Sequence, residues 1–448
     1  MDLNALIGLG TRRRGNSIEE GPRSARQAIS LCRALLSERG EISGVRLAAE
    51  ALGAYEALDE PSKAAFFDLL AQEFSPDPEA VGKAGDAYRK DPSAGNLARL
   101  LTVSEPPRQA LFRRLNLAPN GTRTLVEMRA GLLAKAAPQW APIEADLAHL
   151  LNSWFNRGFL ELHRIDWRTP AIILEKLIQY EAVHQIHGWP DLRRRLEKDR
   201  RCYAFFHPAL PDDPIIFVEV ALTRGMSTKV QPLVNPNTPV TDPRSANCAV
   251  FYSITNCHEG LRGVPFGNFL IKKVAEDLGK ELQQIKVFAT ASPIPGFRNW
   301  LEQVVRDHKD RPRYAAIAHL LSRLDDPEWL REKECLEVSH HELPALCAYY
   351  LMEAKQGKEP VDSVARFHLR NGARLERINW LGDISPAGMR RSCGLLVNYV
   401  YRLSEVERNH EAYVKEYKIV ASRKIESLAR ESLLGRRNHT DSRIPIAG

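Results

Sequence analysis

The feature that most constrains the fold of this chain is a change in hydrophobic periodicity near Gly158. Before it, apolar residues recur at helical spacing in one segment after another, and Pro and Gly separate the segments. After it come short runs rich in β-branched and aromatic residues, some of which alternate polar and apolar positions. The pattern therefore predicts a helical region followed by a region that contains a β-sheet.

The second region has an expected element order of β-α-α-β-β-β-α-β. Strands are expected over 158–167, 201–208, 213–223, 246–255 and 285–291, and helices over 169–186, 189–199 and 268–282. Thr169 is the expected N-cap of the first of these helices, with Pro170 at its first position. Further helices are expected over 299–356 and from about Cys393 to Leu433.

These patterns predict an α+β fold class, in which an all-α helical bundle precedes a mixed β-sheet with flanking helices. The expected domains are a helical bundle over 1–157, a sheet domain over 158–435 and a flexible tail over 436–448. We find no catalytic constellation in the helical part, so its expected role is support or oligomerisation. A homo-oligomer, either a dimer or a tetramer, is expected because the helices exceed what is needed to cover one sheet.

The charge of the chain argues only weakly for a polyanionic partner. Its 448 residues carry a formal net charge of +7, but the basic residues are spread among acidic ones. Dense basic runs occur only at 12–14, 193–195 and 436–437, which favours solvated helix faces over nucleic-acid binding. We therefore expect no nucleic-acid partner.

The cysteines and the apolar runs indicate where such a chain resides. The seven cysteines include no CxxC pair, which predicts free and mostly buried thiols in a reducing compartment. No apolar run approaches the roughly 20 residues of a membrane span, and the N-terminal residues do not resemble a secretory signal. We expect a cytoplasmic protein without a membrane partner.

A glycine-bearing turn from Gly260 to Asn268 lies between an expected strand and an expected helix. Its glycines would let the backbone approach a pyrophosphate, and N–H groups near Gly267 and Asn268 would point at it from the helix start. Arg262 adds positive charge. An ordinary strand-to-helix loop explains the spacing equally well. The turn contains neither a Walker A lysine pattern nor GxGxxG.

Two side chains outside this turn are candidates for chemistry. Ser292 precedes Pro-Ile-Pro, and the prolines hold it on a stiff extended segment that suits a positioning role. His368 lies in FHLRNGA, where a strand and an Asn371-Gly372 hairpin are expected, and an imidazole can exchange protons near neutral pH. The alternatives are a turn serine that bonds its own backbone and a structural histidine.

Two further patterns carry less weight. The run Ser339 to Glu342 contains adjacent histidines, which point in different directions, and we find no third ligand at fixed spacing. We therefore expect no metal site. Tyr399 and Tyr401 lie two residues apart, so they would line a pocket if extended or pack in the core.

Several of these motifs together resemble the malonyl-CoA decarboxylase family. The resemblance spans about 155 to 405 and rests on motifs that occur in order. They are YEAVHQI, WPDLRRRL, RRCYAFFHPALPDDPIIFVEVALT, FYSI, GLRGVPFGNFLIKKV, ASPIPGF, FHLRNGA, RINW and SCGLLVNYVY. The resemblance implies a GNAT-like catalytic domain, with which the expected element order agrees.

The resemblance also implies roles for individual residues. Ser292 and His368 match the catalytic serine and histidine of the family, and Tyr401 falls where the family has a tyrosine near the thioester. The implied coenzyme A segment consists of Arg262, Gly263, Val264, Pro265, Phe266, Gly267 and Asn268.

The implied reaction converts malonyl-CoA to acetyl-CoA and carbon dioxide without a metal or an organic cofactor. Ser292 would orient the substrate carboxylate, and a protonated His368 would deliver a proton to C2. Backbone N–H groups near the glycine turn would stabilise the developing oxyanion. The main alternative is a GNAT-type N-acyltransferase, in which Ser292 and His368 have no catalytic role. A non-catalytic scaffold or nucleic-acid binder is the other.

Overall fold

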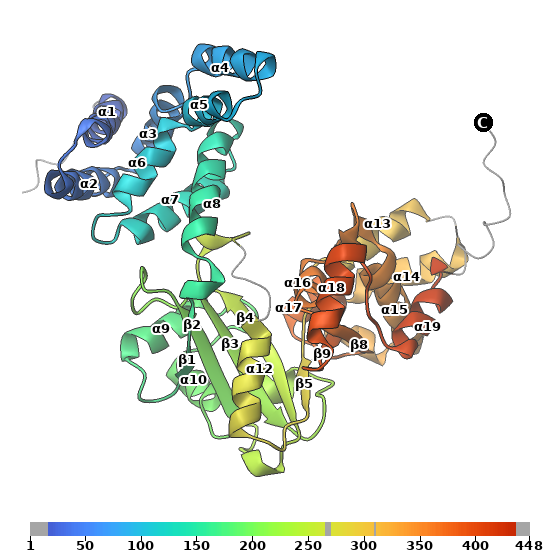
Figure 1. The fold of residues 1–448 in the computed structure, drawn as a ribbon. Coiled ribbons are helices and arrows are strands. Elements are labelled where there is room, and N and C mark those ends of the chain that lie inside the picture. The colour runs from blue at the N-terminus through green and yellow to red at the C-terminus, as the bar shows by residue number, and fades with distance from the viewer. Residues whose placement is uncertain (1–16, 265–269, 309–310, 436–448) are drawn as a thin grey trace, which may run out of the picture. The chain divides into compact units, whose positions relative to one another are not determined.

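The computed structural model describes residues 17–264, 270–308 and 311–435 (Figure 1). It divides into two compact units. The first contains the described residues up to 159 together with the loops at 207–211 and 258–264, and the second contains the rest. The expected tail over 436–448 lies outside the described residues.

The first unit is helical, as the sequence predicts. Its helices are α1 (Ser17–Ser37), α2 (Glu41–Glu56), α3 (Glu60–Glu73), α4 (Pro78–Lys90), α5 (Ala94–Ser104), α6 (Pro107–Leu115), α7 (Gly121–Lys135) and α8 (Ala141–Trp154), with short 3₁₀ turns at Pro138–Trp140, Arg157–Phe159 and Glu259–Leu261. The side chains of Asp59, Asp77 and Ser93 accept hydrogen bonds from first-turn N–H groups of α3, α4 and α5.

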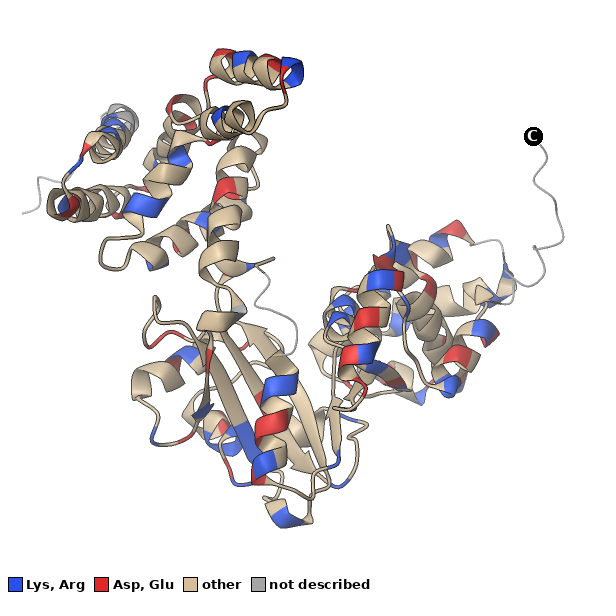
Figure 2. Cartoon of the chain, in the orientation of Figure 1, with Lys and Arg blue, Asp and Glu red and all other residues tan. Residues whose placement is uncertain are grey.

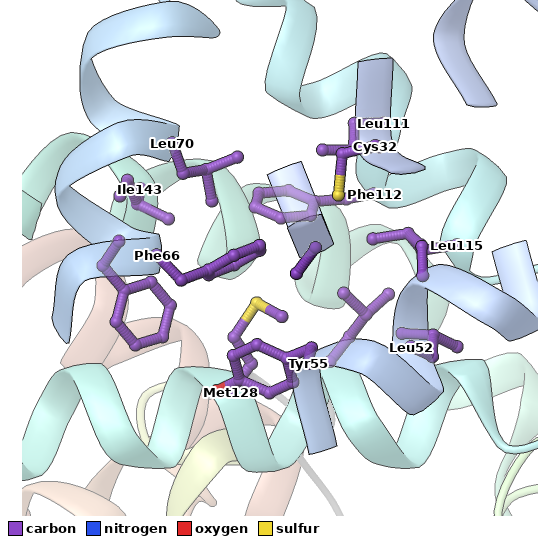
Figure 3. Close-up of a cluster of buried hydrophobic side chains, with 14 of the residues drawn as sticks. Cys32, Leu52, Tyr55, Phe66, Leu70, Leu111, Phe112, Leu115, Met128 and Ile143 are labelled. Carbon is purple, nitrogen blue, oxygen red and sulfur yellow. The ribbon is translucent and has the colours of Figure 1, made fainter. Parts of the chain in front are cut away.

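An apolar core holds α1, α2, α3, α6, α7 and α8 of this unit together. Phe66, Phe112, Leu115 and Met128 lie in it, each at most 2% exposed, and Figure 3 shows their side chains turned toward one another. Beside this core, the buried guanidinium of Arg108 donates to the carboxylate of Asp146. The apolar stripes that predict the helices thus form the interior of one domain.

The second unit is built on a seven-stranded mixed sheet of order β1-β2-β3-β4-β5-β9-β8. Its strands are β1 (Glu161–Ile165), β2 (Arg200–Phe206), β3 (Ile216–Thr223), β4 (Cys248–Asn256), β5 (Val287–Thr290), β8 (Arg374–Asn379) and β9 (Leu396–Tyr401). Only the β4–β5 pairing is parallel, and the other pairings are antiparallel. The strand order along the chain matches the expected one through β5.

Helices accompany the sheet before and after β5. The helices of this unit are α9 (Ala171–Tyr180), α10 (Trp189–Arg195), α11 (Gln231–Val234), α12 (Leu270–Glu281), α13 (Phe297–Asp307), α14 (Pro312–Arg323), α15 (Lys333–Glu353), α16 (Ser363–Arg370), α17 (Pro386–Ser392), α18 (Val406–Glu416) and α19 (Arg423–Glu431). Short 3₁₀ turns lie at Pro243–Ser245 and Pro327–Arg331, and β6 (Lys355–Gln356) pairs with β7 (Glu359–Pro360). The expected fold class, a helical domain followed by a mixed sheet with helices, is confirmed.

Three local expectations are wrong. Thr169 does not cap α9, because Pro170 is the N-cap and the Thr169 hydroxyl accepts from the N–H of Asp166. The expected helix to 186 ends at Tyr180, because the Glu181 carboxylate takes the next free N–H groups of the chain. Residues 396–401 form β9 rather than helix, which suits a buried run of β-branched and aromatic side chains.

The segment around His368 is a helix and not the expected hairpin. The carboxylate of Asp362 accepts a hydrogen bond from the N–H of Ala365 and so starts α16. Gly372 has a φ of +78°, and it ends the helix rather than turning a hairpin. His368 therefore reaches its partners from the last turn of a helix.

Three bulk properties of the described residues can be compared with the sequence-based expectations. Basic and acidic residues are interspersed on the helices of both units (Figure 2). All seven cysteines are buried with free thiols, as predicted. In the ranges that the structure describes, none of the helices combines the length and apolar character needed to cross a bilayer.

Candidate active site

The site begins where the two parallel strands of the sheet separate. β4 and β5 pair over four residues, from Cys248 with Val287 to Phe251 with Thr290. Beyond this point β4 continues beside β3, whereas Ser292 turns to exchange both backbone hydrogen bonds with Val397 of β9, each 2.9 Å long. A cavity of about 230 Å³ lies at this divergence. Its lining includes Ser253, Ser292 and His368.

Three predicted residues meet beside this cavity. The Oγ of Ser292 lies 2.9 Å from Nε2 of His368, and Nδ1 of His368 lies 2.7 Å from the hydroxyl of Tyr401. They come from the segment after β5, from α16 and from β9, so 76 residues separate the first two and 33 the last two. The tertiary fold thus forms a continuous hydrogen-bonded row from three separate elements.

Thr290 decides which atoms of this row carry protons. The hydroxyl of Ser292 donates to Oγ1 of Thr290 over 2.8 Å, and Thr290 also accepts from the N–H of Tyr399. Because a serine has one hydroxyl proton, Ser292 must accept from His368, which places a proton on Nε2. Nδ1 is then the acceptor of the Tyr401 hydroxyl. The row runs Tyr401 to His368 to Ser292 to Thr290, with each group donating to the next.

Burial makes this row neutral. The side chain of His368 is fully enclosed, and the loss of hydration lowers its pKa to about 3. Burial likewise raises the pKa of Tyr401 well above its ordinary value. The ring of Tyr399 stacks on the imidazole with centroids 4.5 Å apart and fixes its plane. The imidazole of His368 is therefore neutral in the site without substrate.

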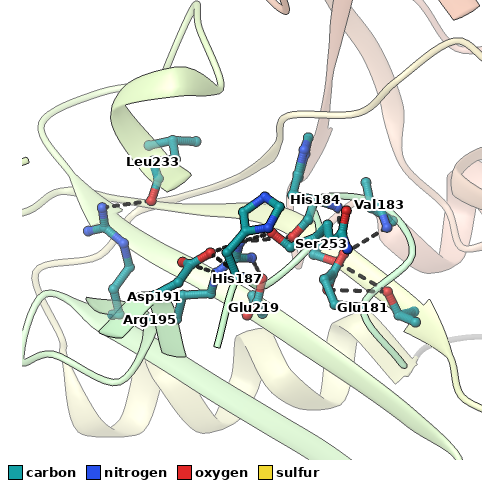
Figure 4. A network of polar contacts seen from close by, with 12 residues as sticks. Glu181, Val183, His184, His187, Asp191, Arg195, Glu219, Leu233 and Ser253 are labelled. Atoms are coloured by element: carbon teal, nitrogen blue, oxygen red, sulfur yellow. Dashed lines mark hydrogen bonds and ion pairs between the residues drawn. The ribbon is translucent and has the colours of Figure 1, made fainter. Parts of the chain in front are cut away.

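A second polar group borders the same cavity, and sequence reasoning missed it. Ser253 of β4 donates to the buried carboxylate of Glu181 over 2.7 Å, and this carboxylate also accepts from the N–H groups of Val183 and His184 (Figure 4). Both Ser253 and Val183 line the cavity.

Sequence reasoning also missed Thr290. This residue lies two positions before Ser292 in an expected strand, and residues i and i+2 of a strand share a face, so the spacing was a usable signal.

Buried ion pairs support this wall from behind. The guanidinium of Arg195 pairs with Asp191 and Glu219 and donates to the carbonyl of His184, as Figure 4 shows. Burial raises the pKa of Glu219, and the nearby guanidinium of Arg195 opposes that shift. The network ties the segment after α9 to β3.

The glycine turn is described only in part. Gly260 lies against α7 within the first unit, where a Cβ on it would stand 1.8 Å from the carbonyl oxygen of Val126. Its lack of a side chain is thus explained by packing and not by the expected approach to pyrophosphate. The Arg262 side chain is exposed and lies 3.4 Å from Glu259, and Gly263 has a φ of +81°. Pro265, Phe266, Gly267 and Asn268 lie outside the described residues.

Two features with possible metal ligands lie in the second unit. His340 and His341 lie on α15, and the ring of His340 contacts Trp380 edge-on. Among the described residues, His319, Glu332 and Cys335 come close enough to hold an ion. The Cys335 thiol, however, donates to Glu332, and burial raises its pKa to about 11, so it is protonated at neutral pH.

The fold and the site together define an α+β enzyme in which a buried serine and histidine line a cavity at a strand divergence, and a buried tyrosine is hydrogen-bonded to the histidine. Family models for the N-terminal and C-terminal domains of malonyl-CoA decarboxylase match residues 74–155 and 158–439. The chain therefore belongs to the malonyl-CoA decarboxylase family.

Similar proteins span nearly the whole chain. The mitochondrial malonyl-CoA decarboxylase of Anser anser anser is 35% identical over 451 residues, covering 92% of this chain and 90% of the relative. The crystal structure of malonyl-CoA decarboxylase from Rhodopseudomonas palustris is 49% identical with a TM-score of 0.85, over 90% of this chain and 99% of that one. The Agrobacterium vitis structure of the same name is 47% identical with a TM-score of 0.84, over the same shares.

Proposed function

We propose that this chain converts malonyl-CoA to acetyl-CoA and carbon dioxide. The observation that carries the proposal is the hydrogen-bonded row of Ser292, His368 and Tyr401 beside the cavity between β4 and β5. An extended chain, such as the pantetheine arm of coenzyme A, would fit in the gap between the two diverging strands. There it would lie beside backbone groups that no neighbouring strand occupies. The acyl end would then meet Ser292 and His368, which line the cavity.

The bond that breaks joins C2 of the malonyl group to its carboxylate. Its electron pair moves into the thioester carbonyl, carbon dioxide leaves, and an enolate remains. Because the thioester itself accepts the electrons, the reaction requires neither a metal nor an organic cofactor. Ser292 acts by rotating its hydroxyl from Thr290 to the substrate carboxylate, which holds the breaking bond perpendicular to the thioester plane. The carboxylate gains a donor, and Ser292 stays hydrogen-bonded to His368.

His368 supplies the proton that C2 requires. The free site holds a neutral imidazole, but a substrate carboxylate beside it favours the protonated form. Substrate binding thus draws one proton from solvent onto the ring, and Nε2 passes it to C2 after carbon dioxide leaves. The balance is one malonyl-CoA carboxylate and one proton in, acetyl-CoA and carbon dioxide out. Tyr401 acts as a positioning residue, because its hydroxyl fixes Nδ1.

The coenzyme A nucleotide needs a separate anchor. We assign this role to residues 262–268, because free N–H groups before a helix and a nearby arginine are a general means of holding phosphate. Arg262 is exposed, and among the described residues it forms an ion pair with Glu259 across a solvent-accessible contact, which leaves its charge open to a phosphate. Substitution of Arg262 by Gln is expected to raise KM while leaving kcat nearly unchanged.

The test is to incubate the purified protein with malonyl-CoA after treatment with a metal chelator, and to follow acetyl-CoA by chromatography. Stoichiometric acetyl-CoA and carbon dioxide are expected, with no change when an amine is added. Acyl transfer to the amine would support the N-acyltransferase alternative. Loss of activity that zinc or magnesium restores would refute the cofactor-free mechanism.

A further inference from the structure

A second, larger cavity lies at the other end of β4, where β3 ends. Its volume is about 730 Å³, and its walls come from α10 and the start of β2, from the end of β3, and from the segment between β3 and β4. The first cavity is lined by residues near the end of β4, from 251 to 256, whereas this one includes Ala246, just before its start. The length of a strand therefore separates the two cavities.

The walls of this second cavity carry more positive charge on guanidinium groups than the neighbouring carboxylates neutralise. Arg194 and Arg200 are both buried, and both pair with the single buried carboxylate of Asp199. Arg224 is exposed in the same wall and forms no ion pair with the residues that the structure describes. Asp242, the other carboxylate of the lining, is already paired with Arg244.

Arg200 also has a donor that lacks an acceptor. Its terminal nitrogens donate to the carbonyls of Asp199 and Leu233, the second of which Figure 4 shows. Its Nε is buried and finds no hydrogen-bond partner in the described part of the chain, although the residue is only 5% exposed. An unsatisfied buried donor costs about 1–3 kcal/mol, and more when it is charged. The described residues thus leave the charge of Arg200 incompletely satisfied.

We propose that this cavity is a second ligand site, which binds the phosphate or carboxylate group of a small anionic metabolite. Guanidinium groups suit both oxyanions, because their N–H groups form a planar fork that matches two oxygens. Arg194 and Arg200 would contribute positive charge from inside the wall, and Arg224 would approach from the exposed side.

A chain of hydrogen bonds leads from this site toward the reactive serine. Asn398 donates through Nδ2 to the carbonyl of Ser227, which lines the second cavity, over 3.1 Å. The same nitrogen donates to the carbonyl of Thr290 over 2.5 Å, and Thr290 accepts the hydroxyl proton of Ser292. A ligand that shifts residues 225–227 would also move the side chain of Asn398, which donates a hydrogen bond to the carbonyl of Thr290. We infer that anion binding changes turnover, and this part rests on the proposed function.

The binding test uses inorganic phosphate and, separately, acetate, titrated calorimetrically into the full-length protein at an ionic strength held constant with sodium chloride. Saturable binding is expected for one or both, and the comparison tells which oxyanion the site prefers. Arg224→Gln is expected to weaken that binding at least tenfold. Arg168→Gln, which removes an exposed arginine outside the cavity, is the control and should bind like the wild type. Equal affinity in wild type and Arg224→Gln, or no saturable binding, would overturn the site.

The coupling test measures kcat with malonyl-CoA at saturating concentrations of the better probe. At least a twofold change is expected in wild type and Arg168→Gln, and none in Arg224→Gln. Binding without any effect on kcat would refute the coupling through Asn398. An enzyme that binds phosphate through Arg224 but never forms acetyl-CoA would instead refute the proposed function and leave the second site standing.

Discussion

At the scale of single residues, the protons of the site are placed by one threonine. Because Thr290 accepts the Ser292 hydroxyl, the imidazole of His368 is held with its Nε2 proton toward the serine and the cavity. The Tyr401 hydroxyl occupies the other nitrogen. A neutral row of this kind can orient a substrate before any charge develops, and the substrate itself supplies the charge that protonates the histidine.

Replacement of His368 by Asn is expected to lower kcat by about 10²–10⁴-fold, the usual contribution of a general acid. KM should change by only a few fold, because the coenzyme A portion binds elsewhere. Steady-state kinetics with malonyl-CoA measure both parameters. His340→Asn, on the exposed side of α15, is the matched control and should behave as wild type. A variant at 368 with near-normal kcat would contradict the proton-donor role.

The Tyr401→Phe variant should isolate the second hydrogen bond of His368. It removes the hydroxyl 2.7 Å from Nδ1 and keeps the ring. We expect about a tenfold loss in kcat and a shifted pH profile, because the orientation of the imidazole is no longer fixed. Tyr399→Phe retains the ring that stacks on His368 and serves as the comparison. Equal rates and pH profiles for the two variants would remove Tyr401 from the mechanism.

The low pKa of His368 also predicts how stability depends on pH. The pKa is about 3 in the folded protein, against about 6.5 in an unfolded chain, so only the unfolded state binds this proton between those values. The free energy of unfolding must therefore fall as pH falls below about 6.5. From pH 8 to pH 5, the wild type should lose about 2 kcal/mol more than His368→Gln. Urea unfolding at both pH values measures this, and equal losses would show that His368 is not buried neutral.

At the scale of elements, the decisive feature is the divergence of β4 from β5. The prolines after Ser292 favour an extended chain, which lets Ser292 leave β4 and pair with Val397. The hydrophobic pattern predicted both strands, but not that they would separate. Likewise, FHLRNGA contains both a helical stripe and an Asn-Gly turn signal, and the Asp362 cap decided in favour of helix.

A substitution at Gly260 can distinguish a role in packing from a role in ligand binding. A Cβ there would overlap the backbone of Val126, so Gly260→Ala should destabilise the first unit by about 1–3 kcal/mol or more. Gly131→Ala in α7 meets nothing within 4 Å and should be neutral or stabilising by up to about 1 kcal/mol. Thermal and urea unfolding compare the two. A stable Gly260→Ala protein with weakened coenzyme A binding would restore the phosphate role.

At the scale of the whole molecule, the helical unit has its own core and presents exposed apolar side chains. Ile42, Leu101 and Leu117 are among them, each more than 60% exposed. Their exposure suits the prediction of a homo-oligomer, in which the helices supply contacts between chains. Light scattering coupled to gel filtration should give two or four times the chain mass of 50.5 kDa. A single-chain mass at micromolar concentration would contradict this prediction.

The sequence alone determined the kinds of element, their order through β5, and the family whose motifs name Ser292, His368 and Tyr401. Periodicity and turn chemistry are local properties, so they are readable without a fold. Only the tertiary structure decided that α16 carries His368, that Thr290 orients Ser292, and that Ser253, which donates to Glu181, borders the cavity. The physical reason is that burial and hydrogen-bond partnership depend on residues far apart in the chain. These long-range neighbours make His368 neutral and leave Arg200 with an unused donor.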